Sequence, residues 1–320
     1  MLQKELLNAI AKKIPNSKSL IEEIASVLCC SYGAAHRRVL DKVKFTFDEA
    51  VLLSRHFNIS LDLLFNVGEK DVLTVRKTEI LKGVEDFENY YKRSIESLTP
   101  LLSIPGAQMI YCAKDLPIFY TSGDNYLSRF KLFVWIKILD PTFNIPKFSE
   151  FHLPKSLREA QLEFGNLYRN LNTVEIWDVT TINSTLKQLH NYLQSKKIAT
   201  NEALIVCNDL KDAVKDIYKK VVPDSNYKLY LNELLLMTNN VLIKTPVQNS
   251  LFVPFTVLNY FNTNDSVTCR QVSNFLDDQM NQSKLLNTSG EKEKDIFFNK
   301  IFEKIDDLKA HIEGQKTLDF

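Results

Sequence analysis

Residues 2–65 carry short apolar repeats at helical spacing, and residues that start or stop helices separate each repeat from the next. Leu2, Leu6 and Ile10 recur four residues apart, and Pro15 ends that repeat. The segments that we predict to be helical are 2–14, 20–28, 32–40, 47–57 and 61–65. Helices this short bury their apolar faces by packing on one another, so the pattern predicts a compact helical domain at residues 1–67.

Helix-capping residues define where two of these helices begin. Ser31 is placed to cap the third segment, in which Ala35 and Val39 lie four apart and face inward. The sequence Thr46-Phe-Asp-Glu49 is a capping-box pattern, in which each side chain accepts a hydrogen bond from the other residue's backbone N–H. The Ser31 cap fixes where the third segment begins, and the capping box marks the start of the fourth.

The second and third segments carry a specific family pattern. The run Ile24-Ala25-x-x-Leu28-x-x-Ser31 resembles the helix-turn-helix of λ-repressor-like (XRE-type) regulators, in which a small residue lets two helices cross closely. The later runs 47–50 and 57–64 resemble the fourth and fifth helices of the same class. The resemblance implies a five-helix domain that binds DNA.

Two positions depart from the pattern of that class. Cys29 stands in the turn where relatives usually have glycine, and Asp41-Lys42 stands where relatives often have glycine. A residue other than glycine is strained wherever such a turn needs a positive φ angle. The departures make these two turns the places where the resemblance is tested.

In a helix-turn-helix the second helix lies in the major groove and presents its first residues to the base edges. Arg37 is the outward arginine that can bond guanine in two places, and Arg38 is placed toward the phosphate backbone. The residues predicted to contact duplex DNA are Ser31, Tyr32, Gly33, His36, Arg37, Arg38, Lys42, Lys44 and Thr46. The alternative is a helical hairpin whose arginines are simply solvated.

The spacing of the cysteines does not predict a metal site. Cys29 and Cys30 are adjacent, and no partner cysteine or histidine stands at zinc-finger spacing, so we predict no metal ion. Cys30 is then a small core residue, with a redox-sensitive turn as the alternative. The chain has five scattered cysteines, which is typical of a reduced, cytoplasmic protein.

The overall composition is that of a globular protein without a global electrostatic signal. The formal net charge is +1, so any attraction for nucleic acid has to be local. Glycine is scarce, with 8 residues, which favours a mainly helical fold. The most apolar run, FKLFVWIKIL, is too short to span a bilayer, so we predict no membrane association.

The remaining chain, residues 68–320, is predicted to be a larger and mostly helical domain with a small antiparallel sheet near 227–257. Apolar stripes predict helices at 84–102, 126–139, 155–172, 180–195, 200–221, 270–282 and 292–312. The runs KLYLNELLLM, NVLIKT and SLFVPF alternate or are rich in branched residues, and predict the three strands. The stripe at 84–102 is either a dimer seam or a helix packed on its own domain.

Several blocks of this second part also resemble a known group. The runs IYCAKDLPIFY, FKLFVWIKIL, TVEIWDVTTINSTLKQLHNY and GEKEKDIFFNKIFEKI are similar to helix-turn-helix regulators common in Bacteroidetes. The similarity covers nearly the whole chain. It implies a DNA-binding head joined to a large regulatory body, and it carries over no effector and no catalytic residue.

Catalytic motifs are missing from the sequence. It has no P-loop, no GxSxG, no HExxH and no recognisable cysteine–histidine spacing, so we predict neither an enzyme nor a cofactor. The aromatic stretch 110–120 either lines a ligand pocket or packs in the core. Lys114 and Asp115 within it would be unusual if buried, and predict an ion pair or the edge of a pocket.

These observations combine into one prediction. The chain is a cytoplasmic transcriptional regulator that binds double-stranded DNA, and residues 68–320 dimerise, sense a small-molecule or protein effector, or do both. Half-sites about 34 Å apart on DNA favour a homodimer. The alternative is a protein-interaction module, antitoxin-like or a scaffold, whose helix-turn-helix no longer binds DNA.

Overall fold

The computed structural model describes residues 2–15, 18–65, 72–234 and 238–316 of the chain. The chain divides between Thr74 and Val75 into two compact parts, the N-terminal unit and the C-terminal unit. The domain boundary predicted at residues 67 and 68 lies outside the described residues.

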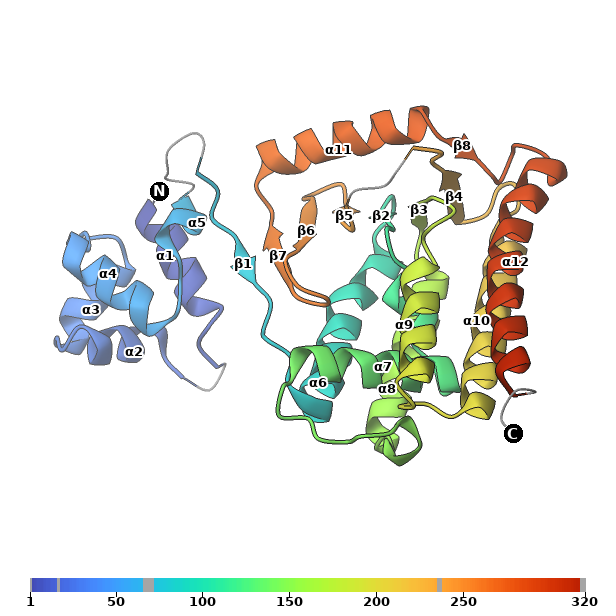
Figure 1. Ribbon diagram of the computed structural model, residues 1–320. Helices are drawn as coiled ribbons and strands as arrows, with labels where there is room; N and C mark the ends of the chain where they lie inside the picture. The colour runs from blue at the N-terminus through green and yellow to red at the C-terminus, as the bar shows by residue number, and fades with distance from the viewer. Residues whose placement is uncertain (1, 16–17, 66–71, 235–237, 317–320) are drawn as a thin grey trace. The chain divides into compact units, whose positions relative to one another are not determined.

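Five short helices make up the described part of the N-terminal unit, where the apolar repeats predict them (Figure 1). They are α1 (Leu2–Ala11), α2 (Leu20–Val27), α3 (Tyr32–Val39), α4 (Phe47–His56) and α5 (Leu61–Phe65). Their inward residues form one apolar core, which includes Leu6, Ile10, Ile24, Ala35 and Leu53. The inward position predicted for Ala35 is confirmed, since that side chain is fully buried.

The C-terminal unit is built on a large mixed sheet, so the predicted mainly helical class with a small antiparallel sheet is wrong. In the described residues the sheet has eight strands in the order β1-β7-β6-β5-β2-β3-β4-β8. The strands are β1 (Arg76–Lys77), β2 (Gln108–Cys112), β3 (Thr173–Trp177), β4 (Tyr227–Leu231), β5 (Val241–Lys244), β6 (Ser250–Pro254), β7 (Tyr260–Thr263) and β8 (Lys284–Leu285). The unit is therefore an α/β fold.

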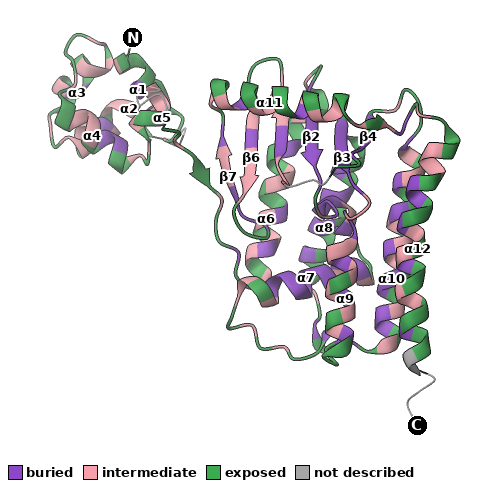
Figure 2. Ribbon diagram, turned by 45° about the horizontal axis from the view of Figure 1, so that its top comes forward, coloured by how far each residue is buried: buried purple, intermediate pink, exposed green. Residues whose placement is uncertain are grey.

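Helices connect and cover these strands. The α-helices are α6 (Gly83–Leu98), α7 (Tyr126–Leu139), α8 (Lys155–Asn170), α9 (Asn183–Gln194), α10 (Thr200–Lys220), α11 (Ser266–Asn281) and α12 (Glu291–Lys316). The short 3₁₀ turns are η1 (Thr99–Ser103), η2 (Ile118–Thr121) and η3 (Phe148–Glu150). The bounds of α7 match the predicted helix, and its residues are buried nearly all round (Figure 2).

The centre of the sheet is parallel and its two sides are antiparallel. Strands β2, β3 and β4 run parallel to one another, and helices α7 to α10 connect them. Strands β5, β6 and β7 then form an antiparallel meander beside β2. The predicted strands β4, β5 and β6 do form, but β4 and β5 are not neighbours, because β2 and β3 lie between them.

Alternate side chains of the strands face two different layers. Met109, Tyr111 and Trp177 join the large core that contains residues of α6 to α10 and α12. Ile110 and Ile176 face the opposite way, toward α11. Figure 1 shows α11 alone on one face of the sheet and the other long helices on the opposite face. The aromatic stretch predicted either to line a pocket or to pack therefore packs.

The apolar stripe of α6 is used within its own unit. Phe87 and Tyr91 are fully buried, and the Tyr91 ring meets Phe164 of α8 at 5.2 Å between centroids. Of the two alternatives for this stripe, packing on its own domain is the one observed. The stripe is not available as a dimer seam.

A fully buried carboxylate lies on β3, the middle one of the three parallel strands. Glu175 of β3 accepts hydrogen bonds from the hydroxyls of Tyr120, Tyr168 and Tyr227 and from the indole N–H of Trp177. Burial raises the pKa of Glu175, and the hydrogen bonds from these donors partly oppose that rise. Each oxygen has two donors, which is the condition under which a polar group is tolerated in a core.

A second buried charge lies on α7. Lys131 is fully buried, and its Nζ lies 3.8 Å from a carboxylate oxygen of Asp115 and 2.9 Å from Oε1 of Gln188. Burial lowers the pKa of Lys131, and Asp115 opposes that change. The ion pair predicted for Lys114 or Asp115 therefore belongs to Asp115, while Lys114 is exposed. In the described ranges no helix is both long and apolar enough to cross a membrane.

Candidate nucleic-acid interface

Helices α2 and α3 are joined by a turn with positive φ at the non-glycine position that the sequence singled out. Cys29 has a φ of 48°, and the N–H of Cys30 donates to the carbonyl of Ala25 at 3.0 Å. The N–H of Cys29 donates to the carbonyl of Ser26 at 3.3 Å, which completes a Schellman motif at the end of α2. The turn that usually carries glycine thus keeps its shape with cysteine.

The end of α3 repeats this geometry. Asp41 has a φ of 59°, and the N–H groups of Asp41 and Lys42 donate to the carbonyls of Arg38 and Arg37 at 3.0 and 2.9 Å. Aspartate tolerates the left-handed region better than most residues, because its short side chain can bond locally. Both departures from glycine therefore fall where the backbone has left-handed φ.

The caps predicted for α3 and α4 are confirmed. The Ser31 hydroxyl accepts a hydrogen bond from the Ala34 N–H at 3.3 Å. The Thr46 hydroxyl accepts from the Glu49 N–H at 3.2 Å, and the Glu49 carboxylate accepts from the Thr46 N–H at 3.0 Å. An accepting hydroxyl keeps its own proton, so Ser31 and Thr46, both exposed, remain able to donate to a phosphate.

The outer face of α3 carries four of the predicted contact residues. Tyr32, Gly33, His36 and Arg37 are all exposed, and Tyr32 and His36 stack at 6.2 Å between ring centroids. In the described part of the chain the Arg37 guanidinium has no ion pair, so it is free to meet a ligand. Nothing lies within 4 Å of the position that a Cβ on Gly33 would take, so the glycine is not required by packing.

Arg38, which the sequence predicts to face DNA phosphates, is partly buried and bonded within the protein. Its Nη2 lies 2.6 Å and its Nε 3.1 Å from the two carboxylate oxygens of Glu49, and its Nη1 donates to the Ala34 carbonyl at 3.2 Å. Burial by itself would raise the pKa of Glu49, but the bonds from Arg38 and Thr46 outweigh burial and lower it. The bidentate pair ties α3 to the start of α4.

The basic residues after α3 lie on a braced loop. The side chain of Gln3 on α1 donates to the carbonyls of Arg38 and Val43, at 2.8 and 2.9 Å, and accepts from the Phe45 N–H at 2.8 Å. Lys42 is exposed, and Lys44 pairs with Asp41 at 2.5 Å while 67% of its side chain stays exposed. Such exposed pairs are weak, so a phosphate can displace Asp41 from Lys44.

Three exposed apolar residues beside this face were not predicted from the sequence. Phe47 is 80% exposed at the start of α4, and Leu40 and Val43 are 50% and 39% exposed at the end of α3 and after it. Their spacing matches the inward repeats that the pattern assigns to the core. The pattern alone therefore gives no signal that separates these three from core residues.

The positions of the cysteines and of the possible metal ligands were also predicted from the sequence. Cys29 is exposed, Cys30 is partly buried against the core, and all five cysteines are free thiols. Among the described residues, no group of three or more histidine, cysteine, aspartate or glutamate side chains is placed to hold a metal ion.

Comparison with known proteins gave no match: no family model, no curated protein and no solved structure matches the chain. The resemblance to helix-turn-helix regulators therefore stays a prediction. The observation that bears on this prediction is the geometry of α2, of the turn that follows it and of α3.

Proposed function

We propose that the chain is a sequence-specific transcriptional regulator whose α3 enters the major groove of duplex DNA. The single observation that carries this proposal is the outer face of α3, where Arg37 stands exposed and pairs with no acidic residue of the described ranges. A neighbouring arginine, Arg38, is locked to Glu49 and fixes the helix on which Arg37 stands. A rigid helix with one free guanidinium is suited to a bidentate contact with guanine O6 and N7.

Residues around Arg37 supply the remaining contacts. Tyr32 meets a thymine methyl or a phosphate, and Gly33 lets the helix approach the bases closely. Lys42 and Lys44 bind phosphates, together with the hydroxyl of Thr46. Arg38 acts here as a positioning residue, because three of its five N–H donors already bond Glu49 and Ala34.

The domain organisation extends the proposal to pairing and regulation. One N-terminal unit offers few contacts, and two-fold pairing on half-sites is how such units usually gain affinity and specificity. We therefore propose a homodimer formed through the C-terminal unit, by a surface other than the buried stripe of α6. An effector acting on that unit and a cytoplasmic location belong to the same proposal.

A second function is favoured by one observation. Leu40, Val43 and Phe47 expose apolar surface next to the α3 face. Exposed apolar groups rimmed by charge are typical of protein-binding surfaces. The alternative is thus a protein-interaction module, antitoxin-like or a scaffold, that uses this fold without binding DNA.

Duplex binding at several salt concentrations separates the two functions. Full-length protein is titrated on a duplex selected from a random pool and on a scrambled duplex. Two lysine–phosphate contacts per N-terminal unit predict a log K versus log[salt] slope of about −2, and a two-fold pair predicts about −4. Selective binding with a slope in this range supports regulation. The absence of any salt-dependent duplex binding would leave the interaction module.

A further inference from the structure

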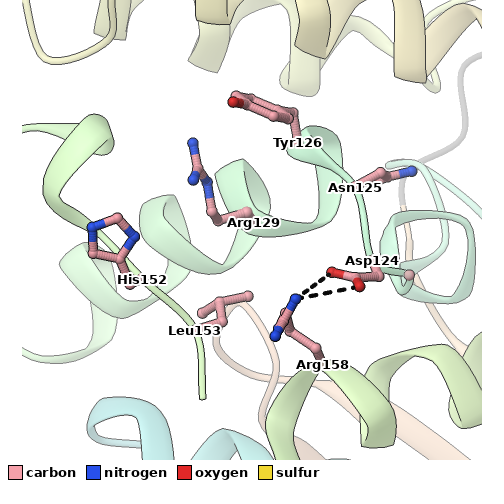
Figure 3. Close-up of a pocket in the computed structure, with 8 residues that line it drawn as sticks. Asp124, Asn125, Tyr126, Arg129, His152, Leu153 and Arg158 are labelled. Atoms are coloured by element: carbon pink, nitrogen blue, oxygen red, sulfur yellow. Dashed lines mark hydrogen bonds and ion pairs between the residues drawn. The ribbon is translucent and has the colours of Figure 1, made fainter. Parts of the chain in front are cut away.

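A pocket of about 350 Å³ opens in the C-terminal unit between the start of α7 and the start of α8. Figure 3 shows that Asp124, Tyr126 and Arg129 come from the first of these regions, and His152 and Arg158 from the second. Pockets of this size accommodate metabolite-sized ligands. Its wall carries two arginines and one aspartate, so anionic ligands are the class to consider.

Arg129 is a fixed cation in this wall. Its guanidinium carbon lies 4.5 Å from the ring centroid of Tyr126 and 4.1 Å from that of Phe148. A carboxylate oxygen of Glu202 lies 3.4 Å from Nη2 of Arg129. The Nε of Arg129 is buried and has no hydrogen-bond partner among the described residues. The rings hold the guanidinium in place, and the long contact to Glu202 leaves its charge incompletely matched.

Arg158 is held loosely and can be recruited. Its Nη1 lies 3.4 and 3.5 Å from the two carboxylate oxygens of Asp124, which is longer than an ordinary charge-assisted bond. About half of each side chain is exposed, with values of 45% for Arg158 and 56% for Asp124. In this arrangement Asp124 occupies the place where a ligand carboxylate or phosphate would bond the same guanidinium.

The starts of α7 and α8, which border the pocket, differ in whether their backbone N–H groups are bonded by side chains. The first N–H groups of α7 are already bonded, since Asn125 accepts from Ser128 at 2.9 Å and Asp209 accepts from Leu127 at 3.1 Å. Helix α8 has no acidic residue in its first turn and no side-chain cap. Its positive end is not neutralised from within the helix, although Glu88 of α6 accepts a hydrogen bond from the Ser156 hydroxyl there at 2.6 Å.

We propose that this pocket binds a small metabolite through its carboxylate or phosphate group, with Arg158 and Arg129 as the cationic contacts and Asp124 as the internal competitor. The ligand carboxylate or phosphate takes the Arg158 guanidinium from Asp124, and the Tyr126 and Leu153 side chains line the adjoining wall. The proposal is independent of DNA binding, because every residue it uses belongs to the C-terminal unit.

Calorimetric titration of the full-length protein tests the proposal with three probes: inorganic phosphate, succinate and adenosine monophosphate. Arg158→Gln should weaken binding of the accepted probe about tenfold or more, because the variant cannot make the bidentate charged bond. Asp124→Asn should strengthen binding about threefold, because the competing carboxylate becomes neutral. Arg169→Gln, an exposed arginine later on α8, is the matched control and should change nothing.

The outcomes separate the ligand sources and can overturn the proposal. Saturable binding of phosphate or of the nucleotide identifies a phosphate site, and binding of succinate alone identifies a carboxylate site. All substituted positions are solvent-exposed, so circular dichroism should show unchanged folding. The proposal is overturned if no probe binds at millimolar concentration, if Arg169→Gln weakens binding as much as Arg158→Gln, or if Asp124→Asn weakens it.

Discussion

The two units of this protein place their charged groups in opposite ways. Among the described residues of the N-terminal unit no charged side chain is buried, and its ion pairs, such as Arg38–Glu49, brace the surface. The C-terminal unit buries Glu175 and Lys131 completely and satisfies them from surrounding side chains. A surface that is to meet another molecule keeps charge accessible, whereas a buried charge specifies how a core is assembled. Substitutions in the two units should therefore fail in different ways.

The largest effect is expected from removing the buried carboxylate. Glu175→Ala leaves three tyrosine hydroxyls and one indole N–H without their acceptor, and should lower the free energy of unfolding of the C-terminal unit by about 3–5 kcal/mol. Both tryptophans, Trp135 and Trp177, lie in this unit, so urea unfolding followed by tryptophan fluorescence reports it. Unchanged stability would mean that the network contributes nothing to the fold.

The pH dependence of the same site has a definite sign. The pKa of Glu175 is raised in the folded unit, so its contribution to stability is fully present below the unfolded pKa of about 4.3 and declines as pH rises toward the folded pKa. The isosteric variant Glu175→Gln cannot titrate. Its deficit relative to the parent protein should therefore shrink as pH rises through that window. A deficit that grows with pH would show that the folded site favours the charged carboxylate.

A close approach between helices predicts the next effect. A Cβ on Gly165 of α8 would lie 2.3 Å from the carbonyl oxygen of Ser122 and 3.3 Å from that of Phe119, the latter within η2. Because both neighbours are backbone atoms, Gly165→Ala should destabilise the C-terminal unit by about 2–3 kcal/mol. The same fluorescence-detected unfolding measures it, with exchange protection in α1 to α5 expected to stay unchanged. Normal stability would show that α8 and η2 can separate freely.

Sequence patterns predicted the N-terminal helices and most helices of the C-terminal unit, but they missed the central strands β2 and β3, and packing explains the difference. The N-terminal helices are amphipathic, so their 3.6-residue period and the caps Ser31 and Thr46 are visible in the sequence. Strands β2 and β3 are parallel and buried on both faces, so they lack the two-residue alternation that identifies a strand. Glu175 also interrupts the apolar run of β3, which hides a five-residue strand.

The candidate site was only partly visible for a related reason. The exposure of Tyr32, His36 and Arg37 follows from helical spacing once Ala35 is buried. The locking of Arg38 depends on Glu49, eleven residues away, and spacing on one helix does not report how side chains meet between helices. Gln3 braces the loop from forty residues away, and no local signal could have found it.

A smaller effect is expected in the N-terminal unit from Arg38→Ala. Removing the bidentate pair to Glu49 should lower the stability of this unit by about 1–2 kcal/mol, with the stability of the C-terminal unit unchanged. The pKa of Glu49 is lowered in the folded unit, so its contribution is present above the unfolded pKa and is lost as pH falls through the folded pKa. Hydrogen exchange across α1 to α5 measures the change, and Arg55→Ala, an exposed arginine on α4, is the control. Equal effects of the two substitutions would contradict a structural role for Arg38.

The smallest effect is expected from Gly33→Ala, for which stability and DNA binding should change in opposite directions. Gly33→Ala meets no atom within 4 Å, and alanine favours helix, so the N-terminal unit should gain up to about 0.5–1 kcal/mol. If Gly33 lets α3 approach the bases, the more stable variant should nevertheless bind the selected duplex less tightly. Hydrogen exchange and duplex titration on the same sample give both numbers. Tighter binding by this variant would remove Gly33 from the interface.

The most direct test of DNA reading by α3 is the base preference of Arg37→Ala, measured by selection from a random duplex pool and compared with Lys44→Ala. We predict that Arg37→Ala binds the parent site less tightly by about 1–3 kcal/mol and accepts any base at one position per half-site. Lys44→Ala should weaken all sequences alike and make the salt slope shallower by about one unit for each phosphate that it no longer neutralises. An Arg37→Ala variant that keeps the parent preference and weakens selected and scrambled duplexes equally would show that α3 does not read DNA through this face.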